Sequence, residues 1–123
     1  MAGIDKVVTL TIAVRDQEEA LRWFTEKLDF EKRLDIAASG MRWLTIAPRK
    51  QREVEFVLAQ WLSDFVGKNA PCVVETQDCQ ETWGILKGRG VTFTQTPTDK
   101  PYGVEAVFED LYGNTYALVE RKE

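Results

Sequence analysis

The feature that most restricts the fold of this chain is a pattern of elements that occurs twice. Asp16 with Glu19 forms a helix-capping box, and Asp78 with Glu81 forms a second one 62 residues later. Around each box, apolar and β-branched runs predict one strand before the helix and three after it. The expected strands are 7–14, 30–36, 41–47, 54–60, 72–76, 91–96, 104–109 and 115–121, and the expected helices are 17–28 and 79–89.

Twice 62 is close to the full length of 123 residues, so the two patterns account for nearly the whole chain. We therefore predict an α+β fold built as a duplicated βαβββ unit, forming one domain over residues 1–123. Module one would span residues 5–60, a linker 61–70, and module two 71–121. A coincidence of element order, which is common in short α+β chains, is the alternative to duplication.

The chain contains no histidine, and this absence restricts its chemistry. Nucleophilic sites of the Ser-His-Asp and Cys-His types and imidazole metal ligands are therefore excluded. A transition metal would have to be held by carboxylates and thiols, and only two cysteines are present. The hydrophobic content of 44% argues for a folded core and against disorder.

Charge and hydropathy indicate where the protein acts and what it does not bind. The formal charge is −4 and the longest basic cluster is Arg49, Lys50 and Arg52, so we expect no nucleic-acid partner. No run of about 18 apolar residues could span a bilayer, and the first residues do not resemble a signal peptide. Two cysteines fit a reducing compartment, and we expect a cytoplasmic protein without a membrane partner.

Several segments together resemble a known superfamily. They are VRD at 14–16, ALRWFTEKLDF at 20–30, LKGRGVTFTQTP at 86–97 and PYGVEAVFEDLYGNTYALVE at 101–120. The most specific pattern is F-x-D-x-x-G-N-x-x-x-L, here Phe108, Asp110, Gly113, Asn114 and Leu118. The chain thereby resembles the vicinal oxygen chelate superfamily of glyoxalase I, bleomycin-resistance proteins and extradiol dioxygenases.

This resemblance implies two tandem βαβββ modules that form a curved mixed sheet with a concave cleft and with helices on its convex face. It also implies a homodimer, as in many relatives, and a divalent metal in enzymatic members. The ligands would come from the first and last strands of each module, and here those positions are Thr9, Pro71, Glu55 and Ala117. Relatives carry His, Gln or Glu there. A single carboxylate does not hold a catalytic metal, so we predict neither a metal nor another cofactor.

Strand alternation predicts which side chains line the cleft instead. If Thr9 points into it, Thr11 does too, whereas Leu10 and Ile12 lie under the helix. Aromatic walls, Tyr102 at the mouth and a few polar anchors are typical of a small-molecule site. The residues predicted to bind the ligand are Thr9, Thr11, Trp43, Glu55, Phe93, Tyr102 and Phe108, with Glu75 as a further anchor.

Each of these residues also has a simpler interpretation. The aromatic side chains could fill a collapsed half-barrel, and Glu55 could face solvent or pair with Arg42 on the neighbouring strand. A buried and unpaired Glu55 would instead have a raised pKa and could act as an acid or base. Cys79, at a helix N-terminus, could have a lowered thiol pKa, but an inert thiol is the simpler interpretation. Trp61 is more typical of packing or dimer contacts than of a ligand contact.

Three functions follow from these observations. The leading hypothesis is a metal-free protein that binds or sequesters a small, partly aromatic molecule. The alternative is a glyoxalase- or dioxygenase-type enzyme that uses an atypical metal site or uses Glu55 as a general base. The third is a purely structural or interaction module, for which an occluded cleft would be diagnostic.

Overall fold

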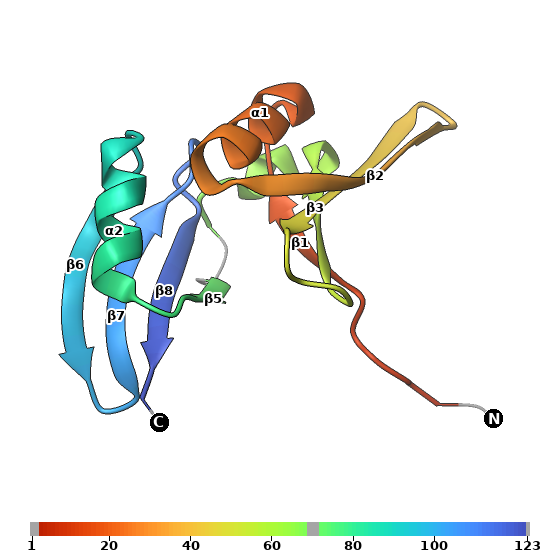
Figure 1. The fold of residues 1–123 in the computed structure, drawn as a ribbon. Helices are drawn as coiled ribbons and strands as arrows, with labels where there is room; N and C mark the ends of the chain where they lie inside the picture. The colour runs from red at the N-terminus through yellow and green to blue at the C-terminus, as the bar shows by residue number, and fades with distance from the viewer. Residues whose placement is uncertain (1–2, 69–71, 123) are drawn as a thin grey trace. The chain divides into compact units, whose positions relative to one another are not determined.

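The computed structural model describes residues 3–68 and 72–122, and these form two compact units, Met1–Ser63 and Asp64–Glu123. Pro71, one of the four positions expected to correspond to metal ligands, lies outside the described residues. The first unit contains β1 (Thr9–Ala13), α1 (Gln17–Leu28), β2 (Phe30–Ala38), β3 (Met41–Pro48) and β4 (Glu55–Ala59). The second contains β5 (Cys72–Glu75), α2 (Cys79–Gly88), β6 (Thr92–Lys100), β7 (Gly103–Glu109) and β8 (Thr115–Arg121). The predicted α+β class and the repeated βαβββ order are confirmed (Figure 1).

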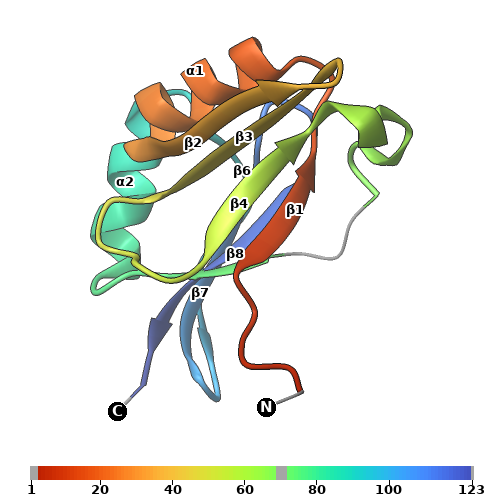
Figure 2. The ribbon, with the colours of Figure 1, turned by 90° about the vertical axis from the view of Figure 1, so that its right-hand side faces the viewer.

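Each module forms its own four-stranded mixed sheet. The strand order is β1-β4-β3-β2 in the first sheet and β5-β8-β7-β6 in the second. In both, the first strand runs parallel to the last and the remaining pairs are antiparallel. One helix covers one face of each sheet, α1 in the first module (Figure 2) and α2 in the second. The 3-10 segment Gln60–Phe65 occupies the start of the predicted linker.

The helices begin where the capping boxes predict. The carboxylates of Asp16 and Asp78 accept hydrogen bonds of 3.0 Å from the backbone N–H groups of Glu19 and Glu81. A side chain from the last strand region of each module supplies a second acceptor, which the sequence did not suggest. Gln60 Oε1 accepts from Gln17 N in α1, and Glu120 Oε1 accepts from Cys79 N in α2.

The two cores use aromatic residues differently. In the first module, Phe56 of β4 stacks on Phe30, and Phe30 contacts Phe24 of α1. In the second, Phe108 of β7 stacks on Tyr116 of β8, with ring centroids 5.1 Å apart, and contacts Phe93. Phe24, Phe30, Phe56, Phe108 and Tyr116 of these clusters are all buried.

The two modules do not superpose at a single offset. Leu10 pairs with Phe56 in the first sheet and Cys72 pairs with Tyr116 in the second. The first strands are therefore 62 positions apart, whereas the last strands are 60 apart. The expected equivalence of Glu55 with Ala117 is wrong, because the register places Ala117 at the position of Val57. The cause is the connection to the last strand, which is shorter in the second module.

Among the described residues, no helix has both the length and the apolar character that crossing a bilayer requires.

Candidate functional site

The face of the first sheet that points away from α1 carries four of the predicted ligand-binding residues. Arg42 of β3 reaches Glu18 of α1, with 2.6 Å between Nη1 and Oε1, so Arg42 marks the α1 side. Because side chains alternate along a strand, the neighbouring positions point the other way. We call this surface the distal face of the first sheet, and it comprises Thr9, Thr11, Trp43, Thr45, Glu55 and Val57.

Two tryptophans stack at one end of the distal face. The ring centroids of Trp43 and Trp61 are 6.1 Å apart and their planes differ by 17°. The side chains are 36% and 47% exposed, so the pair presents aromatic surface rather than filling the core. Sequence reasoning assigned Trp61 to packing or a dimer contact. Continued alternation from Ala59 to Trp61 is the signal that could have placed it beside Trp43.

Glu55 is held by a hydroxyl on the adjacent strand. Thr45 Oγ1 lies 2.7 Å from Glu55 Oε1 and donates to it. The same Oγ1 accepts a 3.0 Å hydrogen bond from the backbone N–H of Leu34. The alternative that paired Glu55 with Arg42 is wrong, because Arg42 points toward α1.

Arg42 instead binds acidic groups on the α1 side of the sheet. Its guanidinium forms two hydrogen bonds of 2.8 Å with the carboxylate of Asp35. These bonds lower the pKa of Asp35 to about 2. The hairpin that joins β2 and β3 is thereby tied to α1 through Glu18.

The two threonines of β1 lie beside the carboxylate strand. Thr9 is half-buried and stands opposite Glu55, while Thr11 is exposed and stands opposite Val57. Ile12 is buried under α1 as predicted. Leu10 is 45% exposed, so its expected burial under the helix is wrong. The structure thus brings Thr9, Thr11, Trp43 and Glu55 onto one face.

The predicted aromatic residues of the second module are not on the equivalent face. Phe108 pairs with Tyr116, and the register equates Tyr116 with Phe56, which lies on the helix side. Phe93 pairs with Phe108 and points the same way. The predicted inward orientation of Phe93 and Phe108 is therefore wrong, and both belong to the core beneath α2. Ala117, which occupies the position equivalent to Val57, pairs with Val107 rather than with Phe108.

Tyr102 is exposed, and its hydroxyl is engaged by a neighbour. It donates a 2.8 Å hydrogen bond to Glu105 Oε2, and this bond raises the pKa of Tyr102. Gln95 Nε2 donates to the other carboxylate oxygen of Glu105 over 3.2 Å. Both oxygens of Glu105 therefore have side-chain donors.

The side chains at the positions expected to correspond to metal ligands do not fit a divalent ion. Thr9 offers a neutral oxygen and Ala117 offers no donor, which leaves Glu55 as the one carboxylate of the set. With the corrected register, the position in the second module that is equivalent to Glu55 is Thr115, which offers another neutral hydroxyl. Within residues 3–68 and 72–122, no three His, Cys, Asp or Glu side chains come together as a metal site would require.

The thiols are also poor candidates for chemistry. Burial raises the pKa of Cys79, whose Sγ lies 3.6 Å from the carbonyl oxygen of Leu118. The lowered pKa that a helix N-terminus could give is therefore not seen. Burial also raises the pKa of Cys72, so the reactive thiolate form is disfavoured at both cysteines.

The motif Asp110-x-x-Gly113-Asn114 has a structural role in the second module. Asp110 accepts hydrogen bonds from the backbone N–H groups of Tyr112 and Asn114, the Asn114 amide and the Tyr116 hydroxyl. Asn114 Oδ1 in turn accepts from Gly67 N at 2.8 Å. Gly113 has a φ of 83°, a conformation that glycine adopts without strain. The motif therefore builds the β7–β8 turn and anchors the chain segment that precedes β5.

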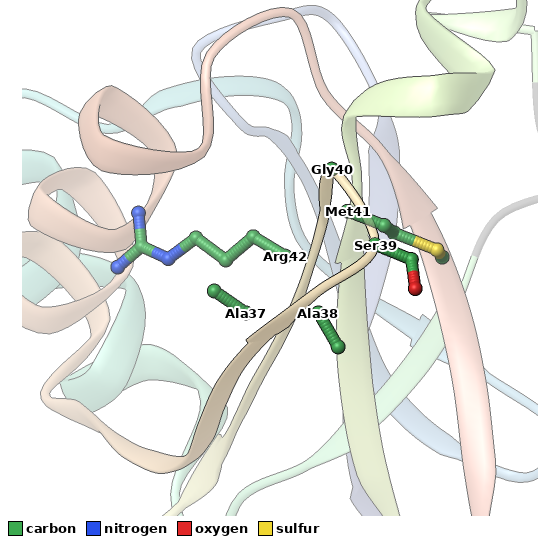
Figure 3. A pocket seen from close by; sticks show the side chains of 6 residues that line it. All are labelled: Ala37, Ala38, Ser39, Gly40, Met41 and Arg42. Atoms are coloured by element: carbon green, nitrogen blue, oxygen red, sulfur yellow. The ribbon is translucent and has the colours of Figure 1, made fainter.

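Two surface pockets lie away from the predicted ligand residues. One of about 370 Å³ is formed by Ala37–Arg42 at the tip of the β2–β3 hairpin, where Figure 3 shows Arg42 and Met41 pointing to opposite sides. The other, about 530 Å³, is lined by Glu75, Thr76, Gln77, Glu120, Arg121 and Lys122. Glu75, expected as an anchor, forms an ion pair with Arg121 there. None of the seven residues predicted to bind the ligand lines either pocket.

Comparison with known proteins extends over nearly the whole chain. The sequence profile of the Glyoxalase/Bleomycin resistance protein/Dioxygenase superfamily matches residues 3–118. The uncharacterized protein YurT of Bacillus subtilis (strain 168) is 32% identical over 126 residues, which cover 94% of this chain and 99% of YurT.

Two solved structures are similar over all or nearly all of their lengths. TnmS3, an antibiotic binding protein from Streptomyces sp. CB03234, is 28% identical with a TM-score of 0.88, covering 99% of this chain and 100% of TnmS3. A glyoxalase/bleomycin resistance protein/dioxygenase superfamily member from Sphaerobacter thermophilus DSM 20745 is 34% identical with a TM-score of 0.83. That alignment covers 94% of this chain and 97% of the Sphaerobacter protein.

Proposed function

The chain belongs to the glyoxalase/bleomycin resistance protein/dioxygenase superfamily, and we propose that it binds a small, partly aromatic molecule without using a metal. The observation that carries this proposal is the exposed Trp43–Trp61 stack on the same face as the Thr45–Glu55 pair. An aromatic surface with a few oriented polar groups is typical of small-molecule sites. Thr9 and Thr11 supply further hydroxyls on this face.

A relative and the donor chemistry support the proposal. TnmS3, which is similar over its whole length, is an antibiotic binding protein. Thr9, Glu55 and Thr115 offer one carboxylate and two neutral hydroxyls, which do not suit Zn²⁺ or Mg²⁺. Sequestration of a flat, partly apolar compound requires neither a metal nor a nucleophile.

Calorimetric titration with uncharged fused-ring aromatics, such as substituted anthraquinones, tests the proposal. Trp43→Ala should weaken binding about tenfold, because the ring loses its stacking surface, and this corresponds to about 1.4 kcal/mol. Trp23→Phe, a change within α1, is the matched control and should leave the affinity unchanged. If Trp43→Ala bound the aromatic probe as tightly as the parent protein, the proposal that the ligand binds at the distal face would be contradicted. Stoichiometric metal in protein purified without a histidine tag would contradict the metal-free assignment.

The hydrogen bond from Thr45 also supports a second candidate function, an isomerase- or lyase-type enzyme with Glu55 as general base. A carboxylate held at one oxygen is positioned to take a proton at the other. Loss of turnover in Glu55→Gln with unchanged ligand affinity would favour this candidate over simple binding.

We also propose a homodimer that acts in the cytoplasm. Leu34, Ile36 and Met41 expose apolar side chains on the β2–β3 hairpin, and such patches are typical of interfaces. Both cysteines are free, which suits a reducing compartment. A monomeric mass by light scattering, at concentrations where the ligand binds, would contradict the dimer.

A further inference from the structure

The direction of the hydrogen bond between Thr45 and Glu55 is fixed by the neighbouring strand. The register of β2 shifts between Lys32 and Asp35, and within this bulge the N–H of Leu34 finds its acceptor in Thr45 Oγ1. Because that hydroxyl is nearly fully buried and accepts from Leu34, its own hydrogen is available to Glu55 Oε1 at 2.7 Å. Glu55 is therefore held as an acceptor, with one oxygen engaged.

The other oxygen of Glu55 has no donor from residues 3–68 or 72–122. Three arginines of the first module are paired with other acids. Arg33 binds Glu31, Arg42 binds Asp35, and Arg49 binds Asp29. Hydrogen bonds from Arg33 to the carbonyls of Pro48 and Gln51 further fix that guanidinium. The only described side chain that donates to Glu55 is thus a neutral hydroxyl, and no cation within residues 3–68 and 72–122 forms an ion pair with the Glu55 carboxylate.

The aromatic pair and this carboxylate are separated along the sheet. Thr45 pairs with Val57 in the antiparallel register, and Trp43 and Glu55 each lie two residues from that pair, in opposite directions. Their backbones are therefore offset by four residues, or roughly 13 Å along the strands. A ligand that contacts both must be elongated, with its ring at one end and its polar group at the other.

We infer that the distal face selects an elongated aromatic ligand whose protonated amine binds the free oxygen of Glu55 while its ring lies against Trp43 and Trp61. A protonated amine supplies both the missing donor and the missing positive charge, and such charge-assisted hydrogen bonds are stronger than neutral ones. The inference rests on the binding function proposed above and adds the chemical class of the ligand.

The test compares two probes with the same ring system, an anthraquinone with an aminoalkyl side chain and its N-acetylated derivative. The parent protein should bind the amine about tenfold more tightly, and this preference should decrease as NaCl is raised. In Glu55→Gln the two affinities should become equal through loss of amine binding alone. The amide oxygen of Gln can still accept from Thr45, so the hairpin is retained.

Glu105→Gln is the matched control, because both oxygens of Glu105 already have donors, and it should keep the full preference. Thr45→Ser should keep the preference and Thr45→Val should reduce it several-fold, since only serine retains the hydroxyl. Equal binding of both probes by the parent protein, or a preference that survives Glu55→Gln, would overturn the inference while leaving the binding function intact. Binding of neither probe at millimolar concentration would overturn both.

Discussion

The two modules share one architecture, but they differ in the hydrogen bonds that a carboxylate on the sheet receives. Glu55 in the first module and Glu105 in the second both point away from the helix of their own sheet. Glu105 accepts from Tyr102 and Gln95, so the second module satisfies both of its oxygens internally. Glu55 accepts from Thr45 alone among the described side chains. The two modules therefore present similar faces, and only the first has a carboxylate oxygen without a described donor on the same face as exposed aromatic rings.

The connections to the last strands also differ between the modules. In the second module the β7–β8 turn is organised from within by Asp110. In the first module, the longer β3–β4 connection is held from outside, because Arg33 of β2 donates to the carbonyls of Pro48 and Gln51. The β7–β8 turn is thus stabilised by hydrogen bonds among its own residues, while the β3–β4 connection depends on a contact with β2.

Replacing the carboxylate that organises the β7–β8 turn should change the stability of the protein most. Asp110→Ala should lower the free energy of unfolding by about 3–5 kcal/mol, because the buried Tyr116 hydroxyl and Asn114 amide lose their shared acceptor. Urea denaturation followed by circular dichroism measures the change. Glu109→Ala, at the adjacent position, is the control and should change stability by less than about 0.5 kcal/mol. A similar small loss in Asp110→Ala would show that the turn does not depend on its carboxylate.

The sequence predicted the features that depend on local signals and missed those that depend on contacts between distant residues. The capping boxes at Asp16 and Asp78 and the β-branched runs are local signals, and they predicted the element order and most element boundaries. The offset between the modules changes from 62 to 60 residues before the last strand. Counting residues from the helix caps could not predict this change. The longer connection is stabilised by Arg33, whose contacts with Pro48 and Gln51 are long-range.

The candidate site was predicted to a similar extent. Alternation from Thr9 correctly grouped Thr11, Trp43 and Glu55, because each strand's pattern is locally readable. The face predicted for Phe108 was wrong. That face depends on the register of β7 against β8, and a shift of one residue moves each side chain to the opposite face of the sheet. The partner of Glu55 was also missed. Thr45 can hold that carboxylate because a bulge in β2 orients its hydroxyl, and no periodicity reports such a bulge.

A medium effect is expected at the second acceptors of the helices. Removing either one, in Gln60→Ala or Glu120→Ala, should cost about 1 kcal/mol, because a backbone N–H of the first turn loses its partner. The acceptor is neutral in the first module and charged in the second. Glu120→Gln should therefore lose roughly 0.3–1 kcal/mol at low salt, and Gln60→Glu should gain a similar amount.

Thermal unfolding at low and high NaCl distinguishes these contributions. The changes in Glu120→Gln and Gln60→Glu should shrink as salt is added, whereas those in the two alanine variants should persist in large part. Salt-independent effects of the charge swaps would mean that hydrogen-bond geometry, rather than charge at the helix N-terminus, separates the two modules.

The smallest effect concerns the pKa of Tyr102, which its bond to Glu105 raises above the ordinary value of 10.0. A raised pKa in the folded state means that this bond stabilises the fold below pH 10 and that the contribution is lost as pH rises through the shifted pKa. In Glu105→Gln the midpoint should return toward 10.0, measured by NMR of ring-labelled tyrosine, while Glu55→Gln should leave it in place. A Tyr102 pKa unmoved by Glu105→Gln would mean that Glu105 also keeps an unused oxygen, and the asymmetry that assigns the ligand to the first module would disappear.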